Sequence, residues 1–256
     1  MNAVHRRQIR EAFSGACDYD RHARVQRVVA RRLARRIAGL PLPERPRILE
    51  IGCGTGFLTA ALIDEGVAGD WLVTDIAPAM VARCRDRIGE CADMRFAVLD
   101  GEYGDPGDGA RFDLVCSSLV MQWFDDPASA LARMLGWLAP EGHCIFATLG
   151  SGSFEEWRRA HEAQGLVCGT PRFPSLGELE AMSPQARQGE LCVEPLTESQ
   201  GSASAFLHAL KAIGAGTAAA GHRPLPPADL RRVMRRFEQQ GASVTYEVVT
   251  GHFRRR

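Results

Sequence analysis

The stretch Arg47-Ile-Leu-Glu-Ile-Gly-Cys-Gly-Thr-Gly56 runs from a short apolar segment directly into three glycines at alternate positions. The apolar segment predicts a buried strand over 47–51, and residues 57–65 predict a helix that Gly66 ends. Glycine suits a turn between a strand and a helix because it tolerates positive φ angles and lets a ligand approach the backbone. The stretch therefore indicates a strand–turn–helix unit of the kind at which parallel sheets bind ligands.

The spacing of these glycines discriminates between classes of ligand. A dinucleotide-binding turn has its third glycine three positions after the second, and here that position is Phe57. A phosphate-binding loop ends in Gly-Lys followed by Ser or Thr, and the chain contains no such sequence. The pattern is instead Glu50-x-Gly-x-Gly-x-Gly56, which disfavours nicotinamide dinucleotides and nucleoside triphosphates as ligands.

Strands and helices continue to alternate after this turn. Further strands are expected over 70–75, 94–99, 112–117 and 143–149, and helices over 78–88 and 127–138. This alternation is typical of an α/β fold with a doubly wound, mostly parallel sheet.

The flanking regions follow a different pattern. An amphipathic, arginine-rich N-terminal helix is expected over about 6–38, ended by the prolines of 40–46. After Gly150, helices are expected over 154–164, 175–182, 203–213 and 228–240, residues 190–196 are compatible with a strand, and 243–253 are expected to form the last strand. We interpret 1–256 as a single domain in which about 151–227 form a helical lid insertion around one sheet.

Composition and charge exclude several classes of protein. Hydrophobic residues make up 45% of the 256 residues, and 31 basic side chains balance 31 acidic ones, so a polycationic nucleic-acid binder is disfavoured. The first residues lack the apolar core of a secretory signal, and no run approaches the roughly 18 apolar residues of a membrane span. The eight cysteines and seven histidines show no ligand spacing, which favours free thiols and no metal. We expect a cytoplasmic protein that binds neither nucleic acid nor membrane.

Two carboxylates are expected at the same edge of the sheet as the glycines. Asp75 ends the second strand about twenty residues after Gly52, where an acidic side chain can bind both hydroxyls of a ribose. Asp100 follows the third strand, where it could meet an adenine amino group. Each residue alone has a structural alternative, Asp75 as a helix cap and Asp100 as a turn residue. Their combination at one edge is more specific than either.

This combination resembles the class I S-adenosylmethionine-dependent methyltransferases. Residues 50–56 are similar to the first motif of that family, Asp75 and Asp100 to its ribose-side and adenine-side acids, and 112–123 to its fourth strand and following loop. The resemblance covers about 13–150 and implies a Rossmann-like seven-stranded sheet whose last strand is antiparallel. It implies S-adenosylmethionine as cofactor, S-adenosylhomocysteine as product, and these cofactor-binding residues: Glu50, Gly52, Gly54, Gly56, Asp75, Ile76, Asp100, Gly101, Ser117 and Gln122.

The flanks are similar to the malonyl-[acyl-carrier protein] O-methyltransferases of biotin synthesis. The similar segments keep their order across nearly the whole chain: 13–26, 117–123, 146–159, 173–179, 210–215 and 245–247. Departures occur at Arg158-Arg-Ala-His161, where the family helix ends in an aromatic residue, and at 216–220, which lack the family's polar residues. The departures affect the detail of the substrate more than the type of reaction.

The resemblance implies that a free malonyl carboxylate attacks the sulfonium methyl group, giving a methyl ester. A carboxylic acid has a reference pKa of about 4 and is already ionised at neutral pH, so no general base is expected. Catalysis would then come from positioning and a water-poor pocket.

Candidate substrate-binding residues follow from this chemistry. Arg158 is expected to orient the carboxylate because a guanidinium fork suits it, with Arg159 as local rival and a solvated arginine as the alternative. Tyr19 is expected to cover the sulfonium or the substrate carboxylate, or else to pack the N-terminal helix. Gln122 and Trp123 are expected to line the pocket, although Trp123 is equally compatible with the core. Lys211, the only lysine, is a further candidate for substrate contact.

The expected partner is a malonyl thioester on an acyl carrier protein, and carrier proteins are acidic. Two arginine clusters could dock one, although solvated helix faces look the same in sequence: Arg24, Arg27, Arg31 and Arg35, and Arg231, Arg232, Arg235 and Arg236.

Other functions on the same fold remain open at this stage. They are another small-molecule or quinone methyltransferase, a respiratory-complex assembly factor that hydroxylates an arginine of a partner protein, and a cofactor-binding scaffold without turnover. The sequence does not distinguish an acyl carrier protein from coenzyme A as carrier, and it does not indicate an oligomeric state.

Overall fold

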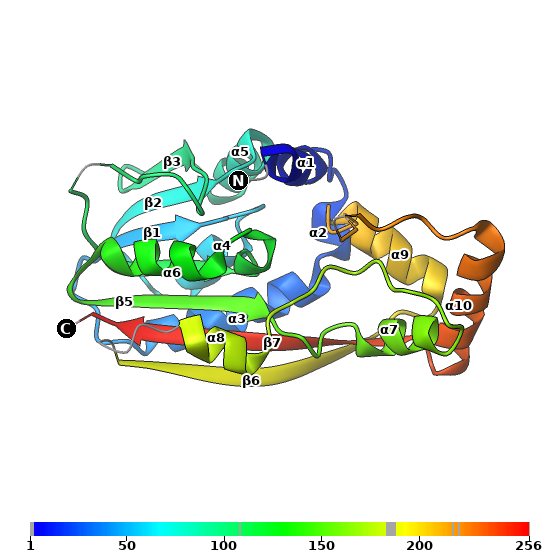
Figure 1. Cartoon of the computed structure of the whole chain (residues 1–256). Helices are drawn as coiled ribbons and strands as arrows, with labels where there is room; N and C mark the ends of the chain where they lie inside the picture. Colours follow the sequence, from blue (N-terminus) through cyan, green and yellow to red (C-terminus); the bar gives the residue numbers. More distant parts are fainter. Residues whose placement is uncertain (1–2, 108, 183–187, 217, 220, 256) are drawn as a thin grey trace.

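A computed structural model describes residues 3–107, 109–182, 188–216, 218–219 and 221–255. Its centre is a seven-stranded sheet in the order β3-β2-β1-β4-β5-β7-β6 (Figure 1). The strands are β1 (Arg47–Ile51), β2 (Asp70–Asp75), β3 (Met94–Val98), β4 (Phe112–Ser118), β5 (Leu138–Leu149), β6 (Gln188–Ser199) and β7 (Ser243–Arg254). Strands β1 to β5 pair in parallel, and β7 is antiparallel to both β5 and β6. The predicted fold class, including the antiparallel last strand, is confirmed.

Helices cover both faces of this sheet (Figure 1). One face packs against α3 (Arg24–Ala38), α4 (Phe57–Asp64) and α5 (Pro78–Ile88), and the other against α6 (Pro127–Gly136) and α8 (Leu176–Met182). Because β1 lies between two helical layers, Ile48 to Ile51 are all buried, which explains its uninterrupted apolar run. The glycine turn therefore extends from the most enclosed part of the sheet.

A third group of helices gathers at one end of the molecule (Figure 1). It consists of α7 (Glu155–Glu162), α9 (Ala203–Ala212) and α10 (Pro227–Gln239). Trp157, Phe206 and Phe237, one from each helix, are buried together with ring centroids 5.3 to 5.7 Å apart. Aromatic pairs of this kind contribute about 0.5–1.5 kcal/mol each beyond area burial. The cluster fixes the three helices to one another beyond the carboxyl edge of the sheet.

The single N-terminal helix expected over about 6–38 is wrong. The chain forms three helices there, α1 (Ala3–Ser14), α2 (Tyr19–His22) and α3. Gly15 begins the break, in which the N–H of Ala16 bonds to the carbonyl of Phe13 and the N–H of Cys17 to that of Gly15. The break contains no proline, and the apolar periodicity of the sequence continues across it. The sequence pattern therefore does not reveal the break.

Two elements of the second half extend beyond their expected bounds. Strand β5, expected from 143, begins at Leu138 because residues 140–142 form an irregularity within the strand, where Glu141 has a φ of 63°. Strand β6 lies inside the expected lid region of 151–227 but belongs to the main sheet, and its Pro195 is tolerated because β6 is an edge strand. The region therefore contributes to the sheet as well as to helices around it. None of the helices in the described part of the chain has the length and apolar character that a membrane crossing requires.

Candidate functional site

A cavity of about 90 Å³ lies at the carboxyl edge of the sheet. Strand ends and their loops supply most of its wall, and α1 and α2 close it from outside. Of the residues expected at the cofactor, those that line it are Tyr19, Gly52, Gly54, Asp75, Ile76, Asp100 and Gly101. The structure thus brings together residues from the ends of β1, β2 and β3 that are separated by up to fifty positions in the sequence.

The glycines of the turn have conformations that require glycine. Gly52, Gly54 and Gly56 have φ angles of 70°, 55° and 87°. A Cβ on Gly52 would also lie 2.3 Å from a methyl carbon of Val120, and one on Gly56 would lie 3.0 Å from the Cys84 sulfur. By contrast, a Cβ on Gly54 would meet only the Tyr19 hydroxyl, at 3.9 Å. Gly54 therefore presents bare backbone to the cavity.

Asp75 both supports the turn and borders the cavity. One carboxylate oxygen accepts the backbone N–H of Gly54 at 2.9 Å, and the other accepts that of Ala77 at 2.8 Å, just before α5 begins. Burial raises the pKa of Asp75, and these backbone donors oppose the rise. Its bond to Ala77 fixes the backbone just before α5 without capping the helix itself, and the same carboxylate lines the cavity.

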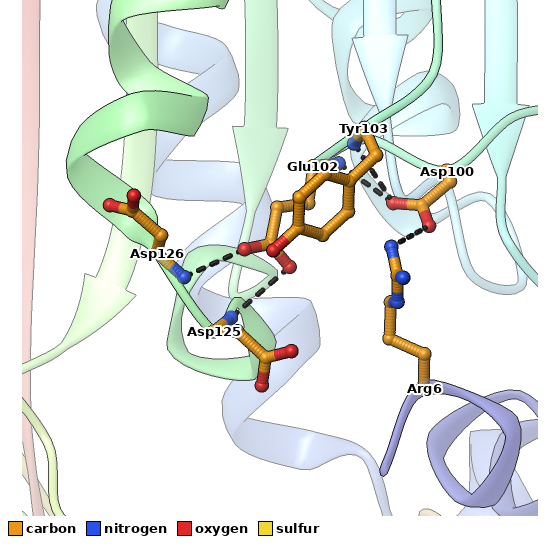
Figure 2. A network of polar contacts seen from close by, with 6 residues as sticks. All are labelled: Arg6, Asp100, Glu102, Tyr103, Asp125 and Asp126. Atoms are coloured by element: carbon orange, nitrogen blue, oxygen red, sulfur yellow. Dashed lines mark hydrogen bonds and ion pairs between the residues drawn. The ribbon is translucent and has the colours of Figure 1, made fainter. Parts of the chain in front are cut away.

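The Asp100 carboxylate forms hydrogen bonds within the turn after β3 and with an arginine of α1 (Figure 2). One carboxylate oxygen accepts hydrogen bonds from the backbone N–H groups of Glu102 and Tyr103. The other accepts a hydrogen bond from the Arg6 guanidinium, with a nitrogen–oxygen distance of 3.0 Å. The guanidinium of Arg6 also lies 4.1 Å from the centre of the Tyr103 ring. The buried Glu102 carboxylate accepts the N–H groups of Asp125 and Asp126, which fastens this turn to the start of α6.

Arg6 is a lining residue that sequence reasoning missed. It reaches the cavity together with Ile9 and Phe13, which share its face of α1 at helical spacing. That spacing is visible in the sequence, but nothing local shows which distant segment the face covers. The bond from Arg6 holds α1 against Asp100, the carboxylate that is expected at the adenine.

A second cavity, of about 50 Å³, adjoins the first. The two share four wall residues: Phe13, Tyr19, Leu119 and Trp123. Gln122 lines this second cavity, where its amide donates to the carbonyl of Leu119 at 2.8 Å and accepts the Thr148 hydroxyl at 3.3 Å. Trp123 lines both cavities, in agreement with its expected place in the pocket wall.

Tyr19 stands at the boundary of the two cavities. Burial of its hydroxyl, together with the nearby Asp75 and Asp20 carboxylates, raises the pKa of Tyr19 well above its ordinary value. The phenol therefore keeps its proton at neutral pH and is available as a hydrogen-bond donor to an anion.

Six of the expected site residues line neither cavity in the described part of the chain: Glu50, Gly56, Ser117, Arg158, Arg159 and Lys211. Glu50 is buried behind the turn and accepts the Thr59 hydroxyl at 2.7 Å, and Gly56 begins α4. Ser117 is buried, whereas its neighbour Ser118 lines the first cavity, because successive strand residues face opposite sides. Arg158 donates to the carbonyls of Ser151 and Ser153, in the turn after β5.

The buried Glu50 carboxyl predicts a dependence of stability on pH. Burial raises its pKa from 4.5 to about 7, so the folded state holds this proton more tightly than the unfolded state, and stability falls as pH rises between these values. Glu50→Gln keeps an oxygen that can accept the Thr59 hydroxyl and replaces the titratable carboxyl group with an amide. At pH 8 the variant is expected to exceed the wild type in unfolding free energy by on the order of 3 kcal/mol, with the gap closing toward pH 4.5.

Denaturant unfolding across this pH range measures the gap. The exposed Glu90→Gln serves as control and is expected to show no pH-dependent difference from the wild type. A Glu50→Gln gap that is constant with pH would contradict the interpretation.

Arg6 and Asp100 pair in the wall of the cavity at which the resemblance places the cofactor, which predicts slower release of a ligand bound there than an open site would allow. Both side chains are mostly covered, and such a pair contributes about 1 kcal/mol. Arg6→Met is therefore expected to speed S-adenosylhomocysteine dissociation about fivefold, measured by stopped-flow fluorescence of the adjacent Trp123. Arg7→Met, which removes the exposed pair with Glu11, is the matched control. Equal rates in the two variants would show that Arg6 does not retain the ligand.

Comparisons with known proteins agree with this geometry. The family model described as a methyltransferase domain matches residues 49–144, which contain the glycine turn and both carboxylates. The computed fold is similar to the crystal structure of the YcgJ protein from Bacillus subtilis, with a TM-score of 0.63 at 15% identity, over 88% of this chain and 97% of that one. At this identity the likeness shows the fold alone.

Two curated relatives match nearly the whole chain. The biotin biosynthesis bifunctional protein BioCD of Bordetella avium is 45% identical over 97% of this chain, which spans 52% of that longer protein. The malonyl-[acyl-carrier protein] O-methyltransferase of Magnetococcus marinus is 40% identical over 95% of this chain and 90% of its own length. Identity at this level over almost the full length of both proteins establishes that the chain belongs to the family of malonyl-[acyl-carrier protein] O-methyltransferases.

Proposed function

We propose that the chain transfers a methyl group from S-adenosylmethionine to the free carboxylate of a malonyl thioester on an acyl carrier protein, an early step of biotin synthesis in the cytoplasm. The observation that carries the proposal is the pair of adjoining cavities. One is bordered by the Asp75 and Asp100 carboxylates, and the other is apolar with a few hydrogen-bonding groups. Tyr19 lies in their shared wall, so a cofactor in the first cavity and an acceptor in the second would lie on either side of it.

The first cavity fits an adenosyl cofactor. Asp75 can accept the ribose hydroxyls and Asp100 the adenine amino group, and the bare backbone of Gly54 admits the methionine part. When bound, S-adenosylmethionine supplies an electrophilic methyl group on a positively charged sulfur. The acidic border of the cavity favours that charge.

The second cavity fits an acceptor that is already ionised. The polar side chains described in its wall are those of Tyr19, Gln26, Gln122 and Tyr246. Burial raises the pKa of Tyr246 as well as that of Tyr19, so both phenols are hydrogen-bond donors at neutral pH rather than bases. A malonyl carboxylate needs donors to orient it and no base to deprotonate it. Its attack forms the O–CH₃ bond as the S–CH₃ bond breaks, with no proton to remove.

The same wall disfavours a phenol or quinol acceptor. Such a hydroxyl has a pKa of about 10 and gains reactivity when a general base takes its proton. Among the described residues of the second cavity none carries a carboxylate or an imidazole. The carboxylate acceptor is therefore the better match to the chemistry of the pocket.

A methyl-transfer assay tests the proposed reaction. The protein is given radiolabelled S-adenosylmethionine with malonyl-carrier protein, and acetyl-carrier protein serves as control. Base-labile label is expected on the malonyl form alone, because the malonyl group ends in a free carboxylate and the acetyl group does not. Absence of label on both forms, with cofactor binding shown separately, would exclude the proposed reaction and favour another acceptor or chemistry on a partner protein.

Arg158 is proposed to support the acceptor pocket. Its guanidinium bonds to two carbonyls of the turn that leads into Phe154, a wall residue of the second cavity. Arg158→Ala leaves these carbonyls without their donor and is expected to lower kcat/KM at least tenfold, which corresponds to about 1.4 kcal/mol. The adjacent Arg159→Ala, whose side chain pairs with Glu155 in solvent, is expected to change it less than twofold. A larger effect at Arg159 would reverse the assignment.

A further inference from the structure

A wide groove continues from the acceptor cavity to the surface. Its volume is about 780 Å³, and it shares Phe154, Pro171, Leu210 and Ala215 with the second cavity. Since the second cavity shares its other wall with the first, the three spaces form one series from the cofactor outward. The groove lies among α1, α7, α9 and the start of α10, at the end of the molecule where α7, α9 and α10 gather (Figure 1).

The walls of the groove suit a long, thin ligand with apolar segments and amides. Apolar side chains come from three helices, Trp157 from α7, Leu207 and Leu210 from α9, and Leu230 from α10. Polar groups are spread along it, among them Thr170, His161 and His222.

Two loops form a preformed outer part of the wall. The N–H of Ala219 bonds to the carbonyl of Gly169 at 2.9 Å, which ties the loop after α9 to the loop after α7. A Cβ on Gly169 would lie 2.6 Å from the ring of His222, so the two loops are also in close contact. The groove is therefore built by the fold rather than left between unattached loops.

The rim of this groove carries positive charge that the protein does not neutralise. Lys211 lines the groove, and Arg223 and Arg231 directly neighbour lining residues in sequence. In the described residues, these three side chains and those of Arg235 and Arg236 are exposed and form no ion pair. Of the acidic groups nearby, Glu11 pairs with Arg7, Asp229 with Arg232, and Glu238 accepts a backbone N–H. The exposed Glu162, next to the lining residue His161, forms no ion pair in the described residues, so the cations at the rim still outnumber the free carboxylates.

The other arginine cluster, on α3, differs in this respect. Arg24 of that cluster pairs with Glu198, and two further arginines of α3, Arg32 and Arg36, pair with Glu194 of β6 at 3.1 and 2.8 Å. In the described part of the chain Arg27 donates to the backbone carbonyl of Asp20, and Arg31 is exposed without an ion pair. Arg35 pairs with Glu65. The structure thereby separates two clusters that the sequence left equivalent, and only the one on α10 presents uncompensated charge beside the groove.

We propose that the groove holds the phosphopantetheine arm of the carrier, with Lys211 at its phosphate and the α10 arginines against the acidic carrier domain; this rests on the proposed function. An arm of this chemistry is a chain of amide and methylene groups with a thioester at one end and a phosphate at the other. The thioester end reaches the acceptor cavity through the shared wall. The phosphate end lies at the rim, where an ammonium group and an arginine surface meet it.

The first experiment measures carrier docking by charge reversal on α10. The double variant Arg231→Glu/Arg235→Glu is expected to raise KM for malonyl-carrier protein at least tenfold at low salt, with kcat little changed. KM for malonyl-coenzyme A, which has the arm but no carrier domain, is expected to change less than threefold. The control Arg31→Glu/Arg95→Glu alters the net charge equally at exposed arginines elsewhere and is expected to leave both values unchanged. Equal effects of the two double variants on the carrier would overturn the docking surface.

The second experiment measures phosphate recognition by Lys211. In the wild type, 4′-phosphopantetheine is expected to inhibit methylation of malonyl-carrier protein at least tenfold more strongly than pantetheine. Lys211→Met keeps the length of the side chain and is expected to remove that preference while leaving S-adenosylhomocysteine affinity unchanged. A preference that survives in Lys211→Met, or no inhibition by 4′-phosphopantetheine in the wild type, would overturn the assignment of the groove.

The wild-type assay separates this proposal from the one on which it rests. If the wild type methylates no malonyl thioester, the proposed function fails first. If it methylates malonyl-carrier protein and both sets of variants behave like their controls, the function stands and the groove assignment fails.

Discussion

The close approach of the turn after β1 to its neighbours is the constraint on which the site depends. A side chain on Gly52 would collide with Val120 after β4, and one on Gly101 would lie 2.2 Å from Ile51. Parallel pairing brings the carboxyl ends of β1 to β4 to one edge, but only these glycines let the loops beyond them converge. The Asp75 carboxylate then bonds to the Gly54 backbone itself, so the shape of the turn and the position of the acid are one arrangement.

Much of this arrangement was predictable from the sequence because it depends on local patterns. A buried strand, three glycines and a helix follow one another directly, and Asp75 and Asp100 end strands whose order the α/β alternation predicts. Local patterns do not reveal which distant segments come into contact. Arg6 shares a helix face with Ile9, yet its partner Asp100 lies ninety-four positions away. The resemblance implies Ser117 at the cofactor, but Ser118 lines the cavity, because adjacent residues of a strand point to opposite faces.

The charge of the described wall residues changes from one of the three spaces to the next. In the wall of the first cavity three carboxylates outnumber one cation, Arg6; neutral hydroxyl and amide groups line the second cavity; and the unpaired charge beside the outer groove is mostly cationic. An anionic substrate meets attraction at the rim and few fixed charges in the middle, where low polarity strengthens each hydrogen bond to it. A positively charged cofactor meets the opposite sign at the inner end. The paired arginines on α3 lie outside this series and fasten a helix to the edge strand β6 instead.

Lysine is nearly absent from this chain, and the one that occurs, Lys211, is exposed on α9 where that helix borders the groove. All the other basic side chains among its 31 lysines and arginines carry guanidinium groups, which acylating reagents leave untouched at neutral pH. Apart from the α-amino group of the chain, an amine-directed dye or cross-linker would therefore find only the Lys211 side chain to acylate, without any engineered cysteine. The protein thus contains its own attachment point for a spectroscopic probe, positioned to report when the groove is occupied.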